Sequence, residues 1–288
     1  MIGRESEVVE VAAAVKAHRL VTLTGVGGVG KTRLAEVPMK RTRVALVTGA
    51  SRGVGAEVAR GLGGTGAHVI VNCREKLKRA HAVVAEIVAA GGSASALAAD
   101  VTDPAAVVAM MRQIGGRFGT LDVLVLNASG GLERDADRGY PMRVNHDAQV
   151  RLVRRALPLM PRGARIVFVT SHQAHFNGRM PIPDFYLAVA QTKRAGEDAL
   201  RAMRAQLVAH DVGLVVVSGD MIDGTIVVRL LERRDPGTVA ERRAHGPLPT
   251  VEQFAGAVVA ATIDPHDFGE TVYIGGTDYT SGDELSEK

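Results

Sequence analysis

Short apolar stretches alternate along most of the chain with longer amphipathic stretches. The apolar stretches are nearly continuous runs of Val, Leu, Ile and Ala, which is typical of strands buried on both faces. They predict strands at residues 20–24, 43–48, 67–72, 94–100, 121–126, 164–170, 212–218 and 270–275. The amphipathic stretches predict helices at residues 53–64, 75–91, 104–117, 142–160, 186–209 and 250–263. This alternation predicts an α/β fold with a doubly wound parallel sheet, in which ligands bind at the carboxyl ends of the strands.

Residues 224–249 interrupt this pattern. They contain Pro236, Pro247 and Pro249 together with two clusters of charged side chains. Prolines and charges after a late strand indicate a mobile lid or a surface loop. At the end of the chain, residues 281–288 form a polar tail.

The composition excludes several classes of protein. With 46% hydrophobic residues among 288, the chain can bury a sizeable core and is not disordered over most of its length. Cys73 is the only cysteine, which excludes a disulfide framework and a cysteine-ligated zinc site and favours a reducing compartment. No apolar run approaches the roughly 20 residues that span a membrane, and the charged N-terminus is unlike a secretory signal. We therefore expect a cytoplasmic protein with no metal and no membrane partner.

The net charge of +4 comes from the first part of the chain. Residues 1–43 carry eight Lys or Arg and four Asp or Glu, and the remaining 27 basic and 27 acidic side chains cancel. A neutral main body lacks the basic surface that binds nucleic acid. We therefore expect a small-molecule ligand and no nucleic acid.

A first glycine-rich motif, GVGGVGKT at residues 25–32, satisfies the pattern G-x4-G-K-[ST] after a predicted strand. The N–H groups of such a loop bind phosphates, and Lys31 would contact them. Residues 2–37 resemble the P-loop start of bacterial signal-transduction ATPases. The rest of such a domain is missing, because Pro38 ends the helix that would follow and the next strand begins another motif. We expect residues 1–42 to be a vestigial P-loop-like segment; weak phosphate binding and ATP-driven regulation are the alternatives.

A second glycine-rich motif, TGASRGVG at residues 48–55, also follows a strand and opens a helix. Glycines in such a turn let the backbone approach a pyrophosphate, and the helix N-terminus faces its negative charge. The motif predicts dinucleotide binding by Gly49, Ser51, Arg52, Gly53, Val54 and Gly55.

From residue 43 to about residue 280 the chain resembles the short-chain dehydrogenase/reductase family. Further matches, in chain order, are Asp100-Val101, Asn127-Ala128 with Ser129 in place of a glycine, Asn145, Ser171 and Gly275-Gly276. The resemblance implies a Rossmann-like domain over residues 43–280 that acts on a carbonyl/alcohol pair of a small molecule. It also implies cofactor contacts by Asp100, Val101, Asn127 and Ala128. The two longest predicted helices could pair in a homo-oligomer, as they do in many relatives.

The end of the second predicted strand indicates which dinucleotide binds. NAD enzymes of this architecture place a carboxylate there, whereas NADP enzymes use Arg to bind the 2′-phosphate. Here the strand ends at Asn72 and Arg74 follows it, the glycine turn supplies Arg52, and Glu75 is the only acid nearby. Because a guanidinium binds phosphate with two parallel hydrogen bonds, these residues predict NADP as the cofactor.

The family's catalytic pattern is only partly present. The resemblance implies catalytic roles for Asn145, Ser171, Tyr186 and Lys193. In the family the Tyr lies four residues before the Lys, so the two side chains are neighbours on the helix and the ammonium lowers the phenol pKa. Here Val189 is the fourth residue before Lys193, and Tyr186 is the seventh. Seven residues rise by about 10.5 Å along a helix, so the phenol would not lie beside the ammonium.

This spacing leaves the proton donor open. An irregular helix start after Pro183 could bring Tyr186 toward the site, or His172 or His175 could serve as the acid–base group. The leading interpretation is an NADP(H)-dependent oxidoreductase acting on a carbonyl/alcohol pair. The alternative is an NADP(H)-binding protein without ordinary redox turnover, either a cofactor sensor or a non-redox enzyme, because the Y-x3-K motif is not intact.

Overall fold

A computed structural model describes the protein, and its contacts divide the chain into two units, Met1–Thr42 and Arg43–Lys288. The described residues are 6–7, 10–11, 14, 21–31, 41–133, 137–179 and 182–276. The predicted tail at residues 281–288 and most of the helix predicted after Lys31 lie outside them.

In the first unit, the strand predicted at residues 20–24 is absent over the described residues 21–24. This prediction was wrong because an apolar run forms a strand only where a partner strand satisfies its N–H and C=O groups. The described part of this unit offers no such partner.

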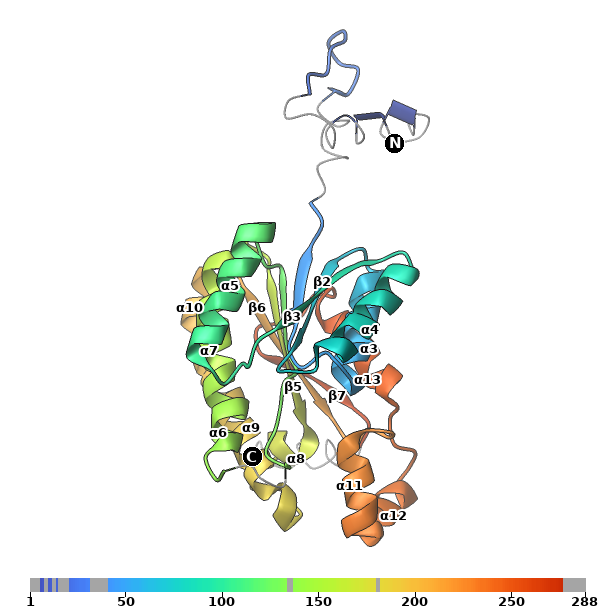
Figure 1. The fold of residues 1–288 in the computed structure, drawn as a ribbon, viewed down its shortest axis with the longest axis vertical. Coiled ribbons are helices and arrows are strands. Elements are labelled where there is room, and N and C mark those ends of the chain that lie inside the picture. The colour runs from blue at the N-terminus through green and yellow to red at the C-terminus, as the bar shows by residue number, and fades with distance from the viewer. Residues whose placement is uncertain are drawn as a thin grey trace, which may run out of the picture. The chain divides into compact units, whose positions relative to one another are not determined.

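In the second unit, seven parallel strands form one sheet in the order β3-β2-β1-β4-β5-β6-β7 (Figure 1). The strands are β1 Val44–Val47, β2 His68–Cys73, β3 Ser93–Ala98, β4 Val123–Leu126, β5 Arg165–Ser171, β6 Gly213–Gly219 and β7 Glu270–Ile274. This arrangement confirms the predicted α/β, Rossmann-like fold with its doubly wound parallel sheet.

Two layers of helices cover the sheet because successive strand side chains point to opposite faces. Val44 and Leu46 of β1 belong to one apolar cluster, and Ala45 and Val47 to the other. The first cluster packs under α5 Pro104–Phe118, α7 Ala148–Ala156, α9 Asp184–Ala202 and α10 Arg204–Ala209. The second packs under α3 Gly53–Gly64, α4 Leu77–Ala89 and α13 Val251–Ala261. Each Val or Leu that is fully buried in these clusters stabilises the folded state by about 1.5–3 kcal/mol relative to an exposed side chain.

The order of the strands reverses beside β1, which lies between β2 and β4. A crevice at the carboxyl ends of the strands is expected at such a reversal. Figure 1 shows that α6 Tyr140–Met142, α8 His172–His175, α11 Ile226–Arg234 and α12 Pro236–Ala244 lie toward this end of the sheet. The functional residues are therefore expected there.

Two predicted helices are divided in the structure. The helix predicted at residues 142–160 consists of α6, a π-helical turn at Arg143–Asp147, α7 and a 3-10 turn at Leu157–Leu159. The helix predicted at residues 186–209 begins earlier, at Asp184, and breaks at Met203 between α9 and α10. The hydrophobic pattern of the sequence does not reveal a local change from α-helical to π-helical or 3-10 geometry. Each interrupted helix was therefore predicted as one continuous helix.

The segment predicted as a loop or lid, residues 224–249, contains the helices α11 and α12, so the loop prediction was wrong. Thr225 caps α11 by accepting a hydrogen bond from Val228 N, and Asp235 caps α12 with Pro236 in its first turn. A proline is favourable at this position, where it starts a helix rather than breaking one. Buried apolar side chains of the two helices (Val228, Leu231 and Val239) form a separate cluster with Met221 before α11 and Leu248 after α12.

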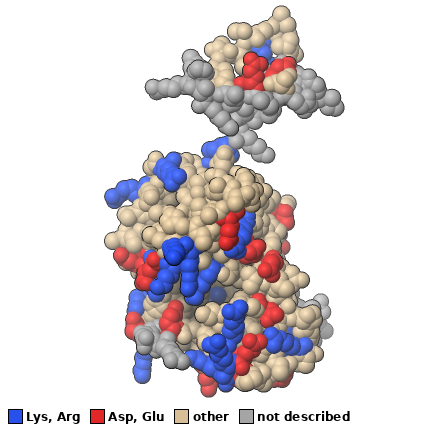
Figure 2. Space-filling model, turned by 45° about the vertical axis from the view of Figure 1, so that its right-hand side comes forward, with Lys and Arg blue, Asp and Glu red and all other residues tan. Residues whose placement is uncertain are grey.

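Basic and acidic side chains lie side by side over the face of the second unit shown in Figure 2. None of the helices in the described part of the chain is long and apolar enough to cross a membrane. The same residues contain no His, Cys, Asp or Glu cluster that could hold a metal ion.

Candidate active site

The second glycine-rich motif forms the turn between β1 and α3. Gly49 and Gly53 have φ angles of +64° and +54°, which favour glycine. Arg52 precedes α3 and provides no side-chain cap, so its side chain leaves the N–H groups of the first helical turn to other acceptors. Such N–H groups at a helix N-terminus bind phosphate.

Close packing against β4 fixes this turn. A Cβ at Gly55 would lie 2.4 Å from Asn127 Nδ2 and 2.7 Å from Gly49 O, so only glycine fits. Asn127 Nδ2 donates to Thr48 O at 2.9 Å, and Thr48 Oγ1 accepts from the N–H groups of Asn127 and Ala128 at 3.0 Å each. The turn is thus a rigid concave backbone surface of the kind that a dinucleotide pyrophosphate requires.

A cavity of about 490 Å³ opens beside the turn. It is lined by Ser51, Arg52 and Gly53 and, across from them, by Asp223, Gly224, Thr250, Val251 and Glu252, with Ala56, Glu57, Arg60 and Val83. The cavity therefore adjoins the predicted phosphate-binding turn but not the predicted catalytic residues.

The other predicted cofactor residues fall into two groups. Asn72 is buried, donates to Leu97 O and Ala99 O and accepts from Gly49 N, so its polar groups are used to hold the turn. Arg74, by contrast, is about half exposed, and its guanidinium donates to Tyr140 Oη at 3.0 Å.

Asp100 and Val101 follow β3. Asp100 Oδ1 accepts from both the N–H and the hydroxyl of Thr102, at 2.8 and 2.7 Å, and Val101 is buried. The loop after β3 therefore has a fixed shape at the same edge of the sheet as the glycine turn.

Ser171 and Tyr186 meet at the carboxyl end of β5. Ser171 ends β5, and its Oγ lies 3.1 Å from Tyr186 Oη, which comes from the first turn of α9. Pro183 is the N-cap of α9, and Tyr186 N donates to Pro183 O at 2.8 Å, so the tyrosine lies in the first turn of the helix. Burial raises the pKa of the phenol above its usual range. The structure thus brings the unusually spaced tyrosine to the serine.

Lys193 lies two turns further along α9 and is also buried. Burial lowers the pKa of its ammonium to about 8, and the nearby carboxylate of Glu197 limits this decrease. Val189, which occupies the fourth position before Lys193, is buried in an apolar cluster with Ala174, Tyr186 and Ala190. No polar group replaces the family's tyrosine at that position.

Asn145 lies in the π-helical turn, a distortion that is frequent at functional sites. Its Oδ1 accepts from Ser129 Oγ at 2.9 Å, and its Nδ2 donates to Gly130 O and Thr192 Oγ1 at 3.0 Å each. A Cβ at Gly196 would lie 2.1 Å from Asn145 O, so α9 approaches this turn as closely as glycine allows. The turn, the loop after β4 and the helix of Lys193 are therefore one rigid unit.

The two histidines considered as proton donors form hydrogen bonds with residues other than Ser171 and Tyr186. His172 is buried; its Nε2 donates to Gly275 O at 2.9 Å and its Nδ1 accepts from Ser218 Oγ at 2.8 Å. Burial lowers the pKa of His172, which favours its neutral form. His175 lies between Glu197 and Tyr273, with ring nitrogens 2.9 and 3.0 Å from their oxygens.

Sequence reasoning missed several residues that position the site. These are Thr48, Thr192, Glu197 and Tyr140. Two of them carried a usable signal, because Thr192 precedes Lys193 and Glu197 follows it by one helical turn. Thr48 opens the second glycine-rich motif, but its contacts after β4 and the contact of Tyr140 with Arg74 join segments far apart in the sequence and could not be predicted.

Comparisons with known proteins agree with this geometry. A profile of the short chain dehydrogenase family matches residues 43–235. The 1-cyclohexenylcarbonyl-CoA reductase of Streptomyces collinus is 30% identical over 224 residues, which are 70% of this chain and 78% of that protein. Versicolorin reductase stcU of Emericella nidulans is 40% identical over 144 residues, which are 47% of this chain and 54% of that protein.

Solved structures are similar over most of the second unit. The reductase LugOII, which catalyses keto-reduction at C1 during lugdunomycin biosynthesis, has a TM-score of 0.70 and 28% identity, covering 82% of this chain and 98% of that one. The angucycline C-6 ketoreductase LanV with bound NADP has a TM-score of 0.69 and 29% identity, covering 82% and 95%. The family profile spans more than half of the chain. The chain belongs to the short-chain dehydrogenase family.

Proposed function

We propose that this protein is an NADP(H)-dependent oxidoreductase that interconverts a carbonyl and an alcohol group of a small molecule. The observation that carries the proposal is the 3.1 Å contact between Ser171 Oγ and Tyr186 Oη at the carboxyl end of β5. The named reductases among its relatives, and the NADP in several solved structures of the family, support the same conclusion.

The residues present fit the cofactor. Gly49, Gly53 and Gly55 form a backbone cradle in which Gly55 leaves no room for a Cβ, and Arg52 lines the adjoining cavity. Arg74 is about half exposed and contacts the exposed Glu75 and the half-buried Tyr140, so its guanidinium can turn to a 2′-phosphate. Further contacts are proposed for Ser51, Val54, Asp100, Val101, Asn127, Ala128 and Lys193. When bound, NADPH supplies the hydride.

Ser171 and Tyr186 act on the substrate oxygen. The Ser171 hydroxyl holds this oxygen, and the Tyr186 phenol exchanges a proton with it. The ammonium of Lys193 is two helical turns from Tyr186 and does not lower the phenol pKa by direct contact. Burial raises that pKa, so the phenol is protonated at neutral pH.

The test is the substitution Tyr186→Phe, which removes only the hydroxyl. It should lower kcat by about 10²-fold or more, the size of a lost general acid. Turnover is measured as NADPH consumption over a panel of ketones, and NADPH affinity, measured separately, should not change. His175→Gln is the matched variant for the competing donor. If His175→Gln abolishes turnover and Tyr186→Phe does not, the phenol is not the acid.

A second candidate function follows from Val189. With no phenol beside Lys193, the protein could bind NADP(H) without ordinary redox turnover, as a cofactor sensor or a non-redox enzyme. Tight NADPH binding by the unmodified protein, together with no reduction of any carbonyl in the panel, would establish this alternative.

We propose that residues 1–42 take no part in either function. Residues 43–280 contain the complete set of proposed cofactor and catalytic residues. The P-loop-like segment is then a vestige.

A further inference from the structure

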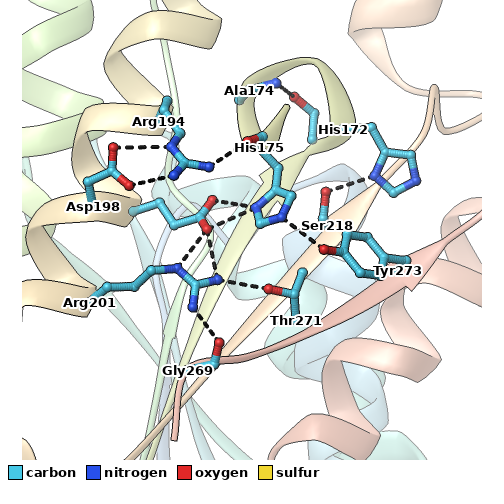
Figure 3. Close-up of polar contacts among 12 residues, drawn as sticks. His172, Ala174, His175, Arg194, Asp198, Arg201, Ser218, Gly269, Thr271 and Tyr273 are labelled. Atoms are coloured by element: carbon cyan, nitrogen blue, oxygen red, sulfur yellow. Dashed lines mark hydrogen bonds and ion pairs between the residues drawn. The ribbon is translucent and has the colours of Figure 1, made fainter. Parts of the chain in front are cut away.

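A network of charged and aromatic side chains lies between α8, α9 and β7, outside the proposed substrate contacts (Figure 3). At its centre is the carboxylate of Glu197, whose side chain is 0% exposed. His175 Nδ1 lies 2.9 Å from both of its oxygens, and Arg201 donates to one of them at 2.8 Å. A fully buried carboxylate is expensive unless it is paired in this way.

Each partner of Glu197 is itself fixed. The His175 Nε2 lies 3.0 Å from Tyr273 Oη, and Arg194 donates to His175 O at 2.6 Å. Arg201 also donates to Gly269 O and, at 2.8 Å, to Thr271 Oγ1 (Figure 3). Glu197 is therefore held in one place by the edge of the sheet and by two helices.

The network joins the two halves of the proposed active site. His175 lies on α8, whose N-cap is Ser171, with Ser171 Oγ accepting from Ala174 N at 3.4 Å. Glu197 lies one turn after Lys193 on α9, so that their side chains are neighbours on the helix. The His175–Glu197 pair thus connects the turn that carries Ser171 to the helix that carries Lys193.

Glu197 is also the charged group whose field acts on Lys193. Burial alone would raise the pKa of Glu197, but its hydrogen bonds and the charges of His175 and Arg201 lower it, so the carboxylate stays ionised. Further titratable groups near the network are Tyr273 on β7 and His172 on α8, and the charges of Asp220 and Arg242 act on His172. The elements packed here also carry the ion pairs Arg194–Asp198 on α9 and His146–Asp147 on the π-helical turn.

We infer that Glu197 is a positioning residue: held by His175 and Arg201, it keeps the buried Lys193 ammonium charged and aligned with Ser171. The inference rests on the proposed function, in which a charged Lys193 binds the cofactor. Lys193 donates no hydrogen bond from Nζ to another described residue, so its donors are available to a ligand. The carboxylate of Glu197, one helical turn away, stabilises the charged form of Lys193, which burial among apolar side chains disfavours.

The experiment measures the NADPH dissociation constant of the full chain between about pH 6 and 9.5, from NADPH fluorescence. In the unmodified protein the affinity should decline as pH rises through about 8, where Lys193 loses its proton. Glu197→Gln should move this decline to lower pH by about one to two pH units. That is the effect of a unit charge at about 6 Å in a medium of effective dielectric constant of about 20 or somewhat more.

A second variant gives a change of the opposite sign. Arg201→Gln removes the cation that partly neutralises Glu197, so the decline should move to higher pH. Arg201 is partly exposed, which makes this variant the less disruptive of the two. Disruption of the fold would not produce opposite shifts from two substitutions in one network.

The matched control is Asp198→Asn, which removes the same charge one residue further along α9, on an exposed side chain. Its pH profile should coincide with that of the unmodified protein. If Glu197→Gln folds but leaves the pH profile in place, or if both variants shift it in the same direction, the inference is overturned. If Glu197→Gln does not fold, the inference is tested by Arg201→Gln alone: a decline of NADPH affinity at higher pH supports it, and an unchanged pH profile overturns it. Absence of NADPH binding by the unmodified protein would instead contradict the proposed function.

Discussion

The chain contains two glycine-rich phosphate-binding motifs that are almost equally convincing as sequence and very different as structure. In the first, Gly28 and Gly30 have φ angles of +81° and +77°, so glycine is needed for the shape of the turn itself. Lys31 Nζ donates to Gly25 O and Val26 O at 2.7 Å each, and the Val26 side chain is exposed. The lysine that would bind phosphate thus contacts its own loop.

The second motif needs glycine for packing as well as for φ. A Cβ at Gly49 would lie 3.0 Å from Ala128 Cα, and one at Gly55 would overlap Asn127. At Gly27 of the first motif a Cβ would meet nothing within 4 Å. The difference shows that a motif specifies a turn, whereas a site also requires neighbouring strands that hold the turn against a ligand.

The largest expected effect comes from adding one methyl group to the second motif. Gly55→Ala should lower the free energy of unfolding by about 1–3 kcal/mol, because overpacking moves Asn127 and the turn. It should also weaken NADPH binding by more than about tenfold, since the N–H groups that face phosphate move with the turn. Thermal denaturation and NADPH titration measure both effects.

Gly27→Ala is the control for this substitution and should change neither quantity. Equal losses from the two substitutions would contradict the distinction between the motifs.

The next effect concerns NADPH binding alone, without loss of stability, and comes from the cations near the second motif. Arg52→Ala or Arg74→Ala should weaken NADPH binding by about ten- to a hundredfold, because each removes a charge-assisted partner worth about 1.5–3 kcal/mol. Binding of NADH should change little, because NADH has no 2′-phosphate. Lys31→Ala should affect neither cofactor. A similar loss for NADPH and NADH would mean that the arginines bind a part common to both molecules.

The smallest effect is expected from removing the first motif entirely. Deletion of residues 1–40 should leave the NADPH dissociation constant and any reductase activity within about twofold, since the second unit contains its own sheet and core. ATP hydrolysis, measured as phosphate release from the full chain, should not be detected. Hydrolysis that Lys31→Ala abolishes would show that the first motif is a working nucleotide site.

Most of the sheet could be predicted from the sequence, because strands buried on both faces are continuous apolar runs. The predictions failed where neighbours decide the structure. The apolar run at residues 20–24 has no partner strand in the described part of its unit. In residues 224–249, Thr225 and Asp235 act as helix caps, and the charged side chains conceal the buried face made by Val228 and Leu231.

The candidate site was less accessible to sequence reasoning. The glycine turn could be predicted because its chemistry is local. The contact of Tyr186 with Ser171 could not, since it depends on where α9 begins after Pro183 and on how that helix packs beside β5. The partners of His175 come from α9 and β7, so the sequence suggested a proton donor where the structure has a side chain bound to a buried carboxylate.

The tyrosines described above give the protein a built-in optical probe. The chain has no tryptophan and four tyrosines, so its ultraviolet emission comes from tyrosine alone. Tyr186 touches Ser171, Tyr140 touches Arg74 and Tyr273 touches His175; the fourth, Tyr279, lies outside the described residues. Each of the three reports on a different part of the proposed site: Ser171 at the carboxyl end of β5, Arg74 after β2, and the buried ionic network of His175 and Glu197. The tyrosine fluorescence of the unlabelled protein should therefore change when ligands bind near these residues. Single Tyr→Phe variants would assign each change to one tyrosine.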